Sequence, residues 1–134
     1  MISHAFDTNA AIALLNGTSA RLAQRLLAQI PGSVALPAVV AHELYWGAFR
    51  SHHVRRNLEN LRALTSELPL LDFDGDDARV AGELRAALAA RGAPIGPYDV
   101  LIAGQAKARG LILVTNNVKE FGRVEGLAIE DWTQ

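Results

Sequence analysis

Short apolar runs alternate with longer stretches of helical periodicity along the chain. An uninterrupted apolar run of a few residues is typical of a strand that is buried on both faces, as in a parallel sheet. Three runs fit this description, Val34–Leu36, Leu111–Val114 and Leu127–Ile129, and the mainly apolar stretches Ile2–Phe6 and Leu70–Phe73 predict two further strands. Between them, apolar positions repeat at helical spacing and predict helices, most of which Gly or Pro residues end. The predicted helices cover residues 8–15, 22–30, 38–49, 54–68, 76–90 and 98–108.

This alternation predicts an α/β protein with a central parallel sheet of four to five strands flanked by helices. The sequence has no internal repeat and no linker rich in Ser or Gly, so we expect residues 1–134 to form one domain. In such sheets, ligands bind at the carboxyl ends of the strands. Asp7 and the segment Thr115-Asn116-Asn117 directly follow two predicted strands, so this rule points to them first.

Composition narrows the classes of function. The chain has 134 residues and no cysteine, which excludes a disulfide scaffold, a thiolate zinc site and a cysteine nucleophile. The lack of cysteine fits a reducing compartment, and no apolar run approaches the length of a membrane span, so we expect a cytoplasmic protein without membrane contact. The net charge of −1 excludes a protein whose whole surface is strongly basic, as in some nucleic-acid-binding proteins, but it is compatible with a local basic patch.

Three carboxylates occupy positions that folding alone does not favour. Asp7 suits a helix N-cap, which by itself is a sufficient structural reason for this residue. Glu43 lies within a predicted helix on an otherwise apolar face, where an uncompensated charge is costly. Asp99 lies in the first turn of its helix, where it compensates the helix dipole, yet apolar residues continue along its face. If the three converge, a divalent cation would relieve their repulsion, and such oxygen-rich clusters bind Mg²⁺ or Mn²⁺.

Several motifs resemble those of PIN-domain ribonucleases. They are Asp7-Thr8-Asn9, Ala41-His42-Glu43-Leu44 and Gly96-Pro97-Tyr98-Asp99. The closing part of the chain is similar to that of the VapC toxins of toxin–antitoxin modules. Its motifs are Leu113-Val114-Thr115-Asn116-Asn117, Lys119-Glu120-Phe121 and Glu130-Asp131-Trp132. The resemblance covers almost the whole chain.

The resemblance implies a PIN-like three-layer fold and Mg²⁺-dependent cleavage of RNA, often structured tRNA, with Mn²⁺ able to substitute. It implies that Asp7, Glu43 and Asp99 bind the metal directly or through water, and that the metal generates hydroxide for attack at phosphorus. It also implies a homodimer and inhibition by a cognate VapB-like antitoxin. The catalytic set expected on this basis is Asp7, Glu43, Asp99 and Glu120.

The chain departs from the family pattern at one position. Many PIN domains have a fourth acid shortly after the last Thr or Ser of this region, where this chain has the neutral Asn117. Glu120 is close by and would supply the missing charge, unless it is a solvated loop carboxylate, so both residues remain candidate metal ligands. We expect Thr115 and Asn116 to support the site through hydrogen bonds, although Thr115 would also fit a simple strand end.

The densest basic segment contains Arg50, His52, His53, Arg55, Arg56 and Arg62. We favour the solvated face of an amphipathic helix over a contact with RNA phosphates or with an acidic antitoxin surface. We expect the neighbouring Tyr45 and Trp46 to pack in the core or at a dimer surface rather than to stack on bases.

Two other functions remain open. The first is a phosphorylation-controlled, receiver-like signalling domain, in which Asp74, Thr115 and Lys119 would play the characteristic parts. Receivers have an acidic pair after the first strand, however, and this chain has Asp7 alone. The second is a non-catalytic antitoxin-binding module, which leaves the three acids without a purpose.

Overall fold

A five-stranded sheet with all strands parallel forms the centre of the computed structural model, which describes residues 1–134. The strand order is β3-β2-β1-β4-β5. The strands are β1 (His4–Phe6), β2 (Val34–Pro37), β3 (Leu70–Leu71), β4 (Ile112–Val114) and β5 (Ile129–Glu130). Because all strands run in one direction, their carboxyl ends meet at one edge of the sheet, with β1 in the middle.

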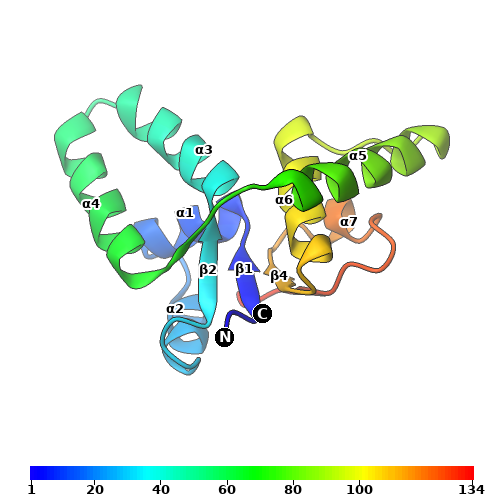
Figure 1. Cartoon of the computed structure of the whole chain (residues 1–134). Coiled ribbons are helices and arrows are strands. Elements are labelled where there is room, and N and C mark those ends of the chain that lie inside the picture. The colour runs from blue at the N-terminus through cyan, green and yellow to red at the C-terminus, as the bar shows by residue number, and fades with distance from the viewer.

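Seven helices flank the sheet (Figure 1). They are α1 (Thr8–Asn16), α2 (Ala20–Leu27), α3 (Ala38–Phe49), α4 (Val54–Glu67), α5 (Gly75–Ala90), α6 (Pro97–Ala108) and α7 (Val118–Phe121). Figure 1 shows α3 and α4 as one hairpin and α5 and α6 as a second pair on the other side of β1 and β2. None of the helices combines the length and the apolar character needed to cross a bilayer.

The predicted α/β class and parallel sheet are confirmed, and the differences are local. The short helix α7 was not predicted, because four residues are too few to establish a periodicity. The last strand is Ile129–Glu130 rather than Leu127–Ile129, because its position is set by pairing of Ile129 with Leu113 and of Glu130 with Val114. Strand β3 covers two of the four residues expected.

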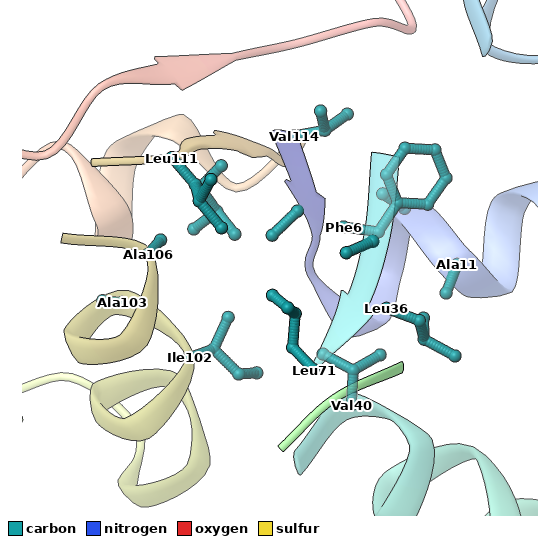
Figure 2. Packing of buried hydrophobic residues seen from close by; sticks show 14 of the residues in the cluster. Phe6, Ala11, Leu36, Val40, Leu71, Ile102, Ala103, Ala106, Leu111 and Val114 are labelled. Carbon is teal, nitrogen blue, oxygen red and sulfur yellow. The ribbon is translucent and has the colours of Figure 1, made fainter. Parts of the chain in front are cut away.

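The core fills the space between the sheet and the helices. Phe6 and Leu36 of the two central strands are fully buried. Figure 2 shows Ile102 of α6 and Val40 of α3 near Leu71 and Leu36, so both helix pairs share one core. This packing fixes the starts of α3 and α6 close to the carboxyl ends of the strands.

A buried polar network holds α6 against α5. The carboxylate of Asp77 is 1% exposed and accepts hydrogen bonds from Gln105 at 3.0 Å and from Arg109 at 2.8 Å. Gly104 lets the two helices touch, because a Cβ at this position would lie 2.5 Å from the Cβ of Ala81. Helix α6, which carries Asp99, is therefore anchored along its second half.

Candidate active site

Asp7 lies at the centre of the site because it follows β1, the middle strand of the sheet. Its Oδ1 caps α1 by accepting a hydrogen bond from the Ala10 amide at 2.7 Å. Its Oδ2 accepts a second hydrogen bond, at 2.5 Å, from the hydroxyl of Thr115 at the end of the neighbouring β4. The predicted N-cap is confirmed, and the same carboxylate, 1% exposed, is held at the carboxyl edge of the sheet.

Glu43 approaches this edge from the middle of α3. The residue is half-buried, and its Oε1 accepts a hydrogen bond from the hydroxyl of Thr8 at 2.7 Å. Thr8 follows Asp7 in the chain, so one hydroxyl links α3 to the end of β1. The prediction of a partly buried carboxylate on this helix is confirmed.

Asp99 and Glu120 form the other half of the site. Asp99 is half-buried in the first turn of α6. Glu120 lies in α7, where its Oε1 accepts a hydrogen bond from the Gly96 amide at 2.8 Å and its Oε2 accepts one from the side-chain amide of Asn117 at 2.5 Å. The backbone N–H of Asn117 in turn donates to the hydroxyl of Thr115 at 2.9 Å. These bonds tie the loop before α6 to the segment that follows β4.

The loop before α6 needs a glycine at position 96. A Cβ there would lie 3.0 Å from Oδ2 of Asp99 and 3.8 Å from Oε1 of Glu120. A side chain would therefore crowd the Asp99 carboxylate, while its distance to Glu120 would be an ordinary contact. Gly96 thus serves the site twice, by donating its amide hydrogen to Glu120 and by leaving space beside Asp99.

Burial and mutual repulsion make two of these carboxyl groups hard to ionise. The pKa of Asp7 is raised from 3.8 to about 6, mainly by burial, and the charges of Glu43 and Asp131 raise it while its hydrogen bonds lower it. The pKa of Asp99 is raised from 3.8 to about 7, first by burial and then by the charge of Glu120 and a hydrogen bond with it. Glu43 and Asp7 add smaller contributions to Asp99. Asp7, Glu43, Asp99 and Glu120 therefore belong to one electrostatic neighbourhood.

These carboxylates fit a hard divalent cation by charge and by donor type. In the conformation seen, no three His, Cys, Asp or Glu side chains are grouped closely enough to hold an ion by themselves. Mg²⁺ does not need such a cage, because it keeps several waters and is bound through one or two carboxylates together with substrate phosphates. The raised pKa values of Asp7 and Asp99 show that burial, and secondarily the neighbouring acids, make ionisation costly, a cost that a bound cation would offset.

Three residues of the site were not assigned a role from the sequence: Thr8, Gly96 and Asp131. Asp131 follows β5 as Asp7 follows β1, and its charge reaches Asp7. Its position after a strand was the available signal, but the predicted strand ended at Ile129. Asn116, expected to support the site, is exposed, and the hydrogen bonds of this segment come from Thr115 and Asn117 instead.

The structure separates the residues that a receiver-like domain would need. Asp74 follows β3 and caps α5, whereas Thr115 follows β4. Strands β2 and β1 lie between these two, so the two strand ends are about 14 Å apart. Asp74 is engaged in a capping box with Asp77.

The aromatic residues next to the basic segment lie on the surface. Tyr45 and Trp46 are 38% and 58% exposed, which excludes the core, the first of the two locations expected for them. The buried face of α3 consists of Val40, Ala41, Leu44 and Ala48. Tyr45 and Trp46 lie outside this face, on the exposed side of the helix. Their packing at a dimer surface stays a prediction.

Comparison with known proteins agrees with this architecture. The chain matches the PIN domain over residues 5–127. It is 40% identical to the tRNA(fMet)-specific endonuclease VapC of Shigella flexneri over 133 residues, which make up 99% of this chain and 100% of the relative. It is 34% identical to the Ribonuclease VapC2 of Haemophilus influenzae over 98% of this chain and 99% of the relative.

Solved structures show the same fold. The crystal structure of DNA-bound VapBC from Salmonella typhimurium matches with a TM-score of 0.95 at 38% identity, covering 98% of this chain and 99% of that chain. VapBC-1 from nontypeable Haemophilus influenzae matches with a TM-score of 0.90 at 30% identity over the full length of both chains. The chain therefore belongs to the PIN-domain family and, within it, to the VapC ribonucleases.

Proposed function

We propose that this protein is a metal-dependent endoribonuclease toxin of a type II toxin–antitoxin module. Its place among the VapC ribonucleases makes it an RNA-cleaving hydrolase. The observation that supports metal dependence is the gathering of Asp7, Glu43, Asp99 and Glu120, whose negative charge is uncompensated. Such a cluster repels a phosphodiester group unless a cation lies between them.

The residues of the site divide into ligands and groups that orient them. Asp7, Glu43 and Asp99 would hold Mg²⁺ or Mn²⁺, directly or through water, with Glu120 as a further ligand candidate. When bound, such a cation would lower the pKa of a coordinated water molecule and stabilise negative charge on the phosphoryl group. The hydroxyl of Thr115 keeps Asp7 in place.

We also propose structured tRNA as the substrate and a VapB-like antitoxin as the inhibitor. Relatives from Shigella flexneri and Salmonella typhimurium are named tRNA(fMet)-specific endonucleases, so initiator tRNA is the first candidate. Solved complexes of relatives pair VapC with VapB, which supports an antitoxin partner. On this proposal the protein acts as a homodimer in the cytoplasm, where its substrate is found.

The test is cleavage of unfractionated tRNA by purified, antitoxin-free protein with Mg²⁺, Mn²⁺ or EDTA. We expect discrete fragments with either metal and none with EDTA. The variants Asp7→Asn and Asp99→Asn should be inactive, because each loses a charged oxygen ligand. Asp76→Asn is the matched control: this exposed carboxyl lies in the first turn of α5, outside the site, and should leave activity unchanged.

Three results would contradict the proposal. Fragments that persist in EDTA, or wild-type activity of Asp99→Asn, would exclude the metal mechanism. If refolded wild-type protein leaves both tRNA and bulk RNA intact with metal present, the non-catalytic antitoxin-binding module becomes the better description.

A further inference from the structure

The α3–α4 hairpin concentrates positive charge on an otherwise acidic chain. Residues 50–62 contain four arginines and one glutamate, a charge of +3 with histidine neutral, while the whole chain carries −1. The remaining residues therefore carry −4. Residues 50–62 comprise the connection after α3 and most of α4, so the charge lies on the turn of the hairpin and along its second helix (Figure 1).

The arginines of this segment have no acidic or hydrogen-bonding partner within the chain, and Arg50 alone contacts an aromatic ring, that of Trp46. They are Arg50, Arg55, Arg56 and Arg62, and all four are exposed. None of them takes part in an ion pair or a side-chain hydrogen bond, and the nearby Glu59 is not paired with any of them. Elsewhere, four of the seven arginines donate hydrogen bonds to protein oxygens, namely Arg25, Arg91, Arg109 and Arg123, whereas the exposed Arg21, Arg79 and Arg85 are isolated cations on α2 and α5. The hydrogen-bond donors of the four hairpin guanidinium groups are thus available to a ligand.

Trp46 adds a stacking surface beside these cations. The guanidinium of Arg50 lies over the Trp46 ring, 3.7 Å from its centroid, yet the residue is still 58% exposed. An exposed aromatic ring next to free cations is the combination by which proteins bind single-stranded nucleic acid, through a stacked base and phosphate contacts.

This surface continues directly from the carboxylate site. Glu43 and Trp46 lie three residues apart on one face of α3, and Arg50, the capping residue directly after the helix, places its guanidinium over the Trp46 ring. The distance from Glu43 to Arg50 along the helix axis is roughly 10 Å. A strand with a phosphodiester bond at Glu43 can therefore reach Trp46 and Arg50 with its next nucleotides.

We propose that Trp46, Arg50, Arg55, Arg56 and Arg62 form the surface that binds the RNA substrate, an inference that rests on the proposed ribonuclease function. The acidic centre repels the phosphates it acts on, so attraction must come from cations beside it. Arginines alone would also suit an acidic protein, but the stacked ring on the helix face of Glu43 favours RNA. This assignment replaces the simple solvated helix face that the sequence favoured and, for Trp46, the expected packing at a dimer surface.

The test measures RNA binding separately from cleavage, with fluorescein-labelled unfractionated tRNA and the Asp99→Asn protein. Adding Arg55→Gln and Arg56→Gln should weaken binding roughly tenfold and reduce the slope of log Kd against log salt by about 1.4, which is 0.7 for each lost single-strand phosphate contact. The matched control is Arg21→Gln with Arg79→Gln, which removes the same charge from exposed arginines of α2 and α5. The control should keep the affinity and the slope.

Tryptophan fluorescence tests the stacking contact. The chain has two tryptophans, and Trp132 is 1% exposed, so quenching by bound tRNA reports on Trp46. We expect quenching in the parent protein and none in Trp46→Leu, with thermal unfolding confirming that the variant is folded.

The two proposals fail in different ways. Equal tRNA affinity of the hairpin and control variants would contradict the proposed RNA-binding surface and would leave the hairpin as a protein contact. Trp46 emission that stays unquenched when tRNA is bound would contradict it in the same way. Absence of EDTA-sensitive cleavage with tRNA binding intact would overturn the ribonuclease alone. In an active protein, the hairpin variants should raise KM and leave kcat close to the wild-type value, because they touch binding and not the reacting groups.

Discussion

Three of the four acidic side chains of the site, those of Asp7, Glu43 and Glu120, accept hydrogen bonds from specific donors. Thr115 donates to Asp7 and Thr8 donates to Glu43. Such bonds fix the orientation of a carboxylate before substrate arrives, so little reorganisation is needed during the reaction. The activity should therefore be sensitive to residues that never touch RNA.

Gly96→Ala should lower kcat/KM for tRNA cleavage by about tenfold or more while the protein stays folded. The added methyl group would lie 3.0 Å from Oδ2 of Asp99 and displace that carboxylate. The φ angle of −57° at Gly96 suits alanine, so the backbone itself is not strained. In the control Gly82→Ala, the Cβ meets nothing within 4 Å, and activity should be unchanged. Wild-type activity of Gly96→Ala would show that Asp99 does not need this space.

Thr8→Val should reduce activity roughly tenfold, the effect expected for one lost hydrogen bond to a charged group. The valine keeps the shape of threonine but cannot donate to Glu43. Thr8→Ser retains the hydroxyl and should recover most of the activity. Cleavage rates at saturating metal and tRNA give the comparison, and equal rates for the valine and serine variants would exclude the positioning role.

The pairing of α5 and α6 determines where Asp99 lies. Although burial raises the pKa of Asp77, the hydrogen bonds from Arg109, Asp74 and Gln105 hold it below its usual value. Asp77 thus acts as an anion that joins the start of α5 to the end of α6. Since Asp99 lies in the first turn of α6, the network stabilises the helix that presents it.

Asp77→Ala should lower the free energy of unfolding by about 2–4 kcal/mol, because it leaves Gln105 and Arg109 without their buried acceptor. Urea denaturation of the metal-free protein measures this change. The neighbouring Asp76 is exposed, so Asp76→Ala should cost less than about 1 kcal/mol through the helix dipole alone. Equal effects of the two substitutions would mean that the network contributes nothing to stability.

The acidic site makes stability depend on pH and on metal. Both raised pKa values belong to acids, so the folded state disfavours their ionisation. Below pH 3.8, the pKa of these groups in the unfolded chain, both carboxyl groups are protonated and their contribution to the free energy of unfolding is at its full value. This contribution is lost as pH rises through the folded-state pKa, about 6 for Asp7 and about 7 for Asp99. The shift at Asp7 alone corresponds to roughly 3 kcal/mol.

In EDTA, the melting temperature should therefore fall between about pH 5 and about pH 7.5. Mg²⁺ should restore part of the loss, and more at the higher pH, because the cation binds the ionised carboxylates. Asp7→Asn should show a smaller fall, since it lacks one of the two groups. Calorimetry in EDTA and in Mg²⁺ gives these values, and a melting temperature that rises with pH in EDTA would contradict the electrostatic account.

The local pattern of the chain was enough to predict the central strands and the helices that carry the acids. A strand buried on both faces needs an apolar run, and the run before Asp7 and that before Thr115 both end in polar residues. The helix of Glu43 followed from apolar spacing and its apolar face. Helix α7 could not be found in this way, because it is too short for a repeat and forms where Glu120 contacts Gly96 and Asn117.

Packing decided which of these residues meet. The strand order β3-β2-β1-β4-β5 makes Asp7 and Thr115 neighbours and separates Asp74 from both. The local hydrophobic periodicity of the sequence does not predict this order. Thr8 reaches Glu43 across 35 positions, and Thr115 reaches Asp7 across 108. Element types depend on interactions between near neighbours in the chain, which the sequence displays directly. Strand order and the contacts of the site depend on how distant segments bury their apolar faces together, which only the folded molecule reveals.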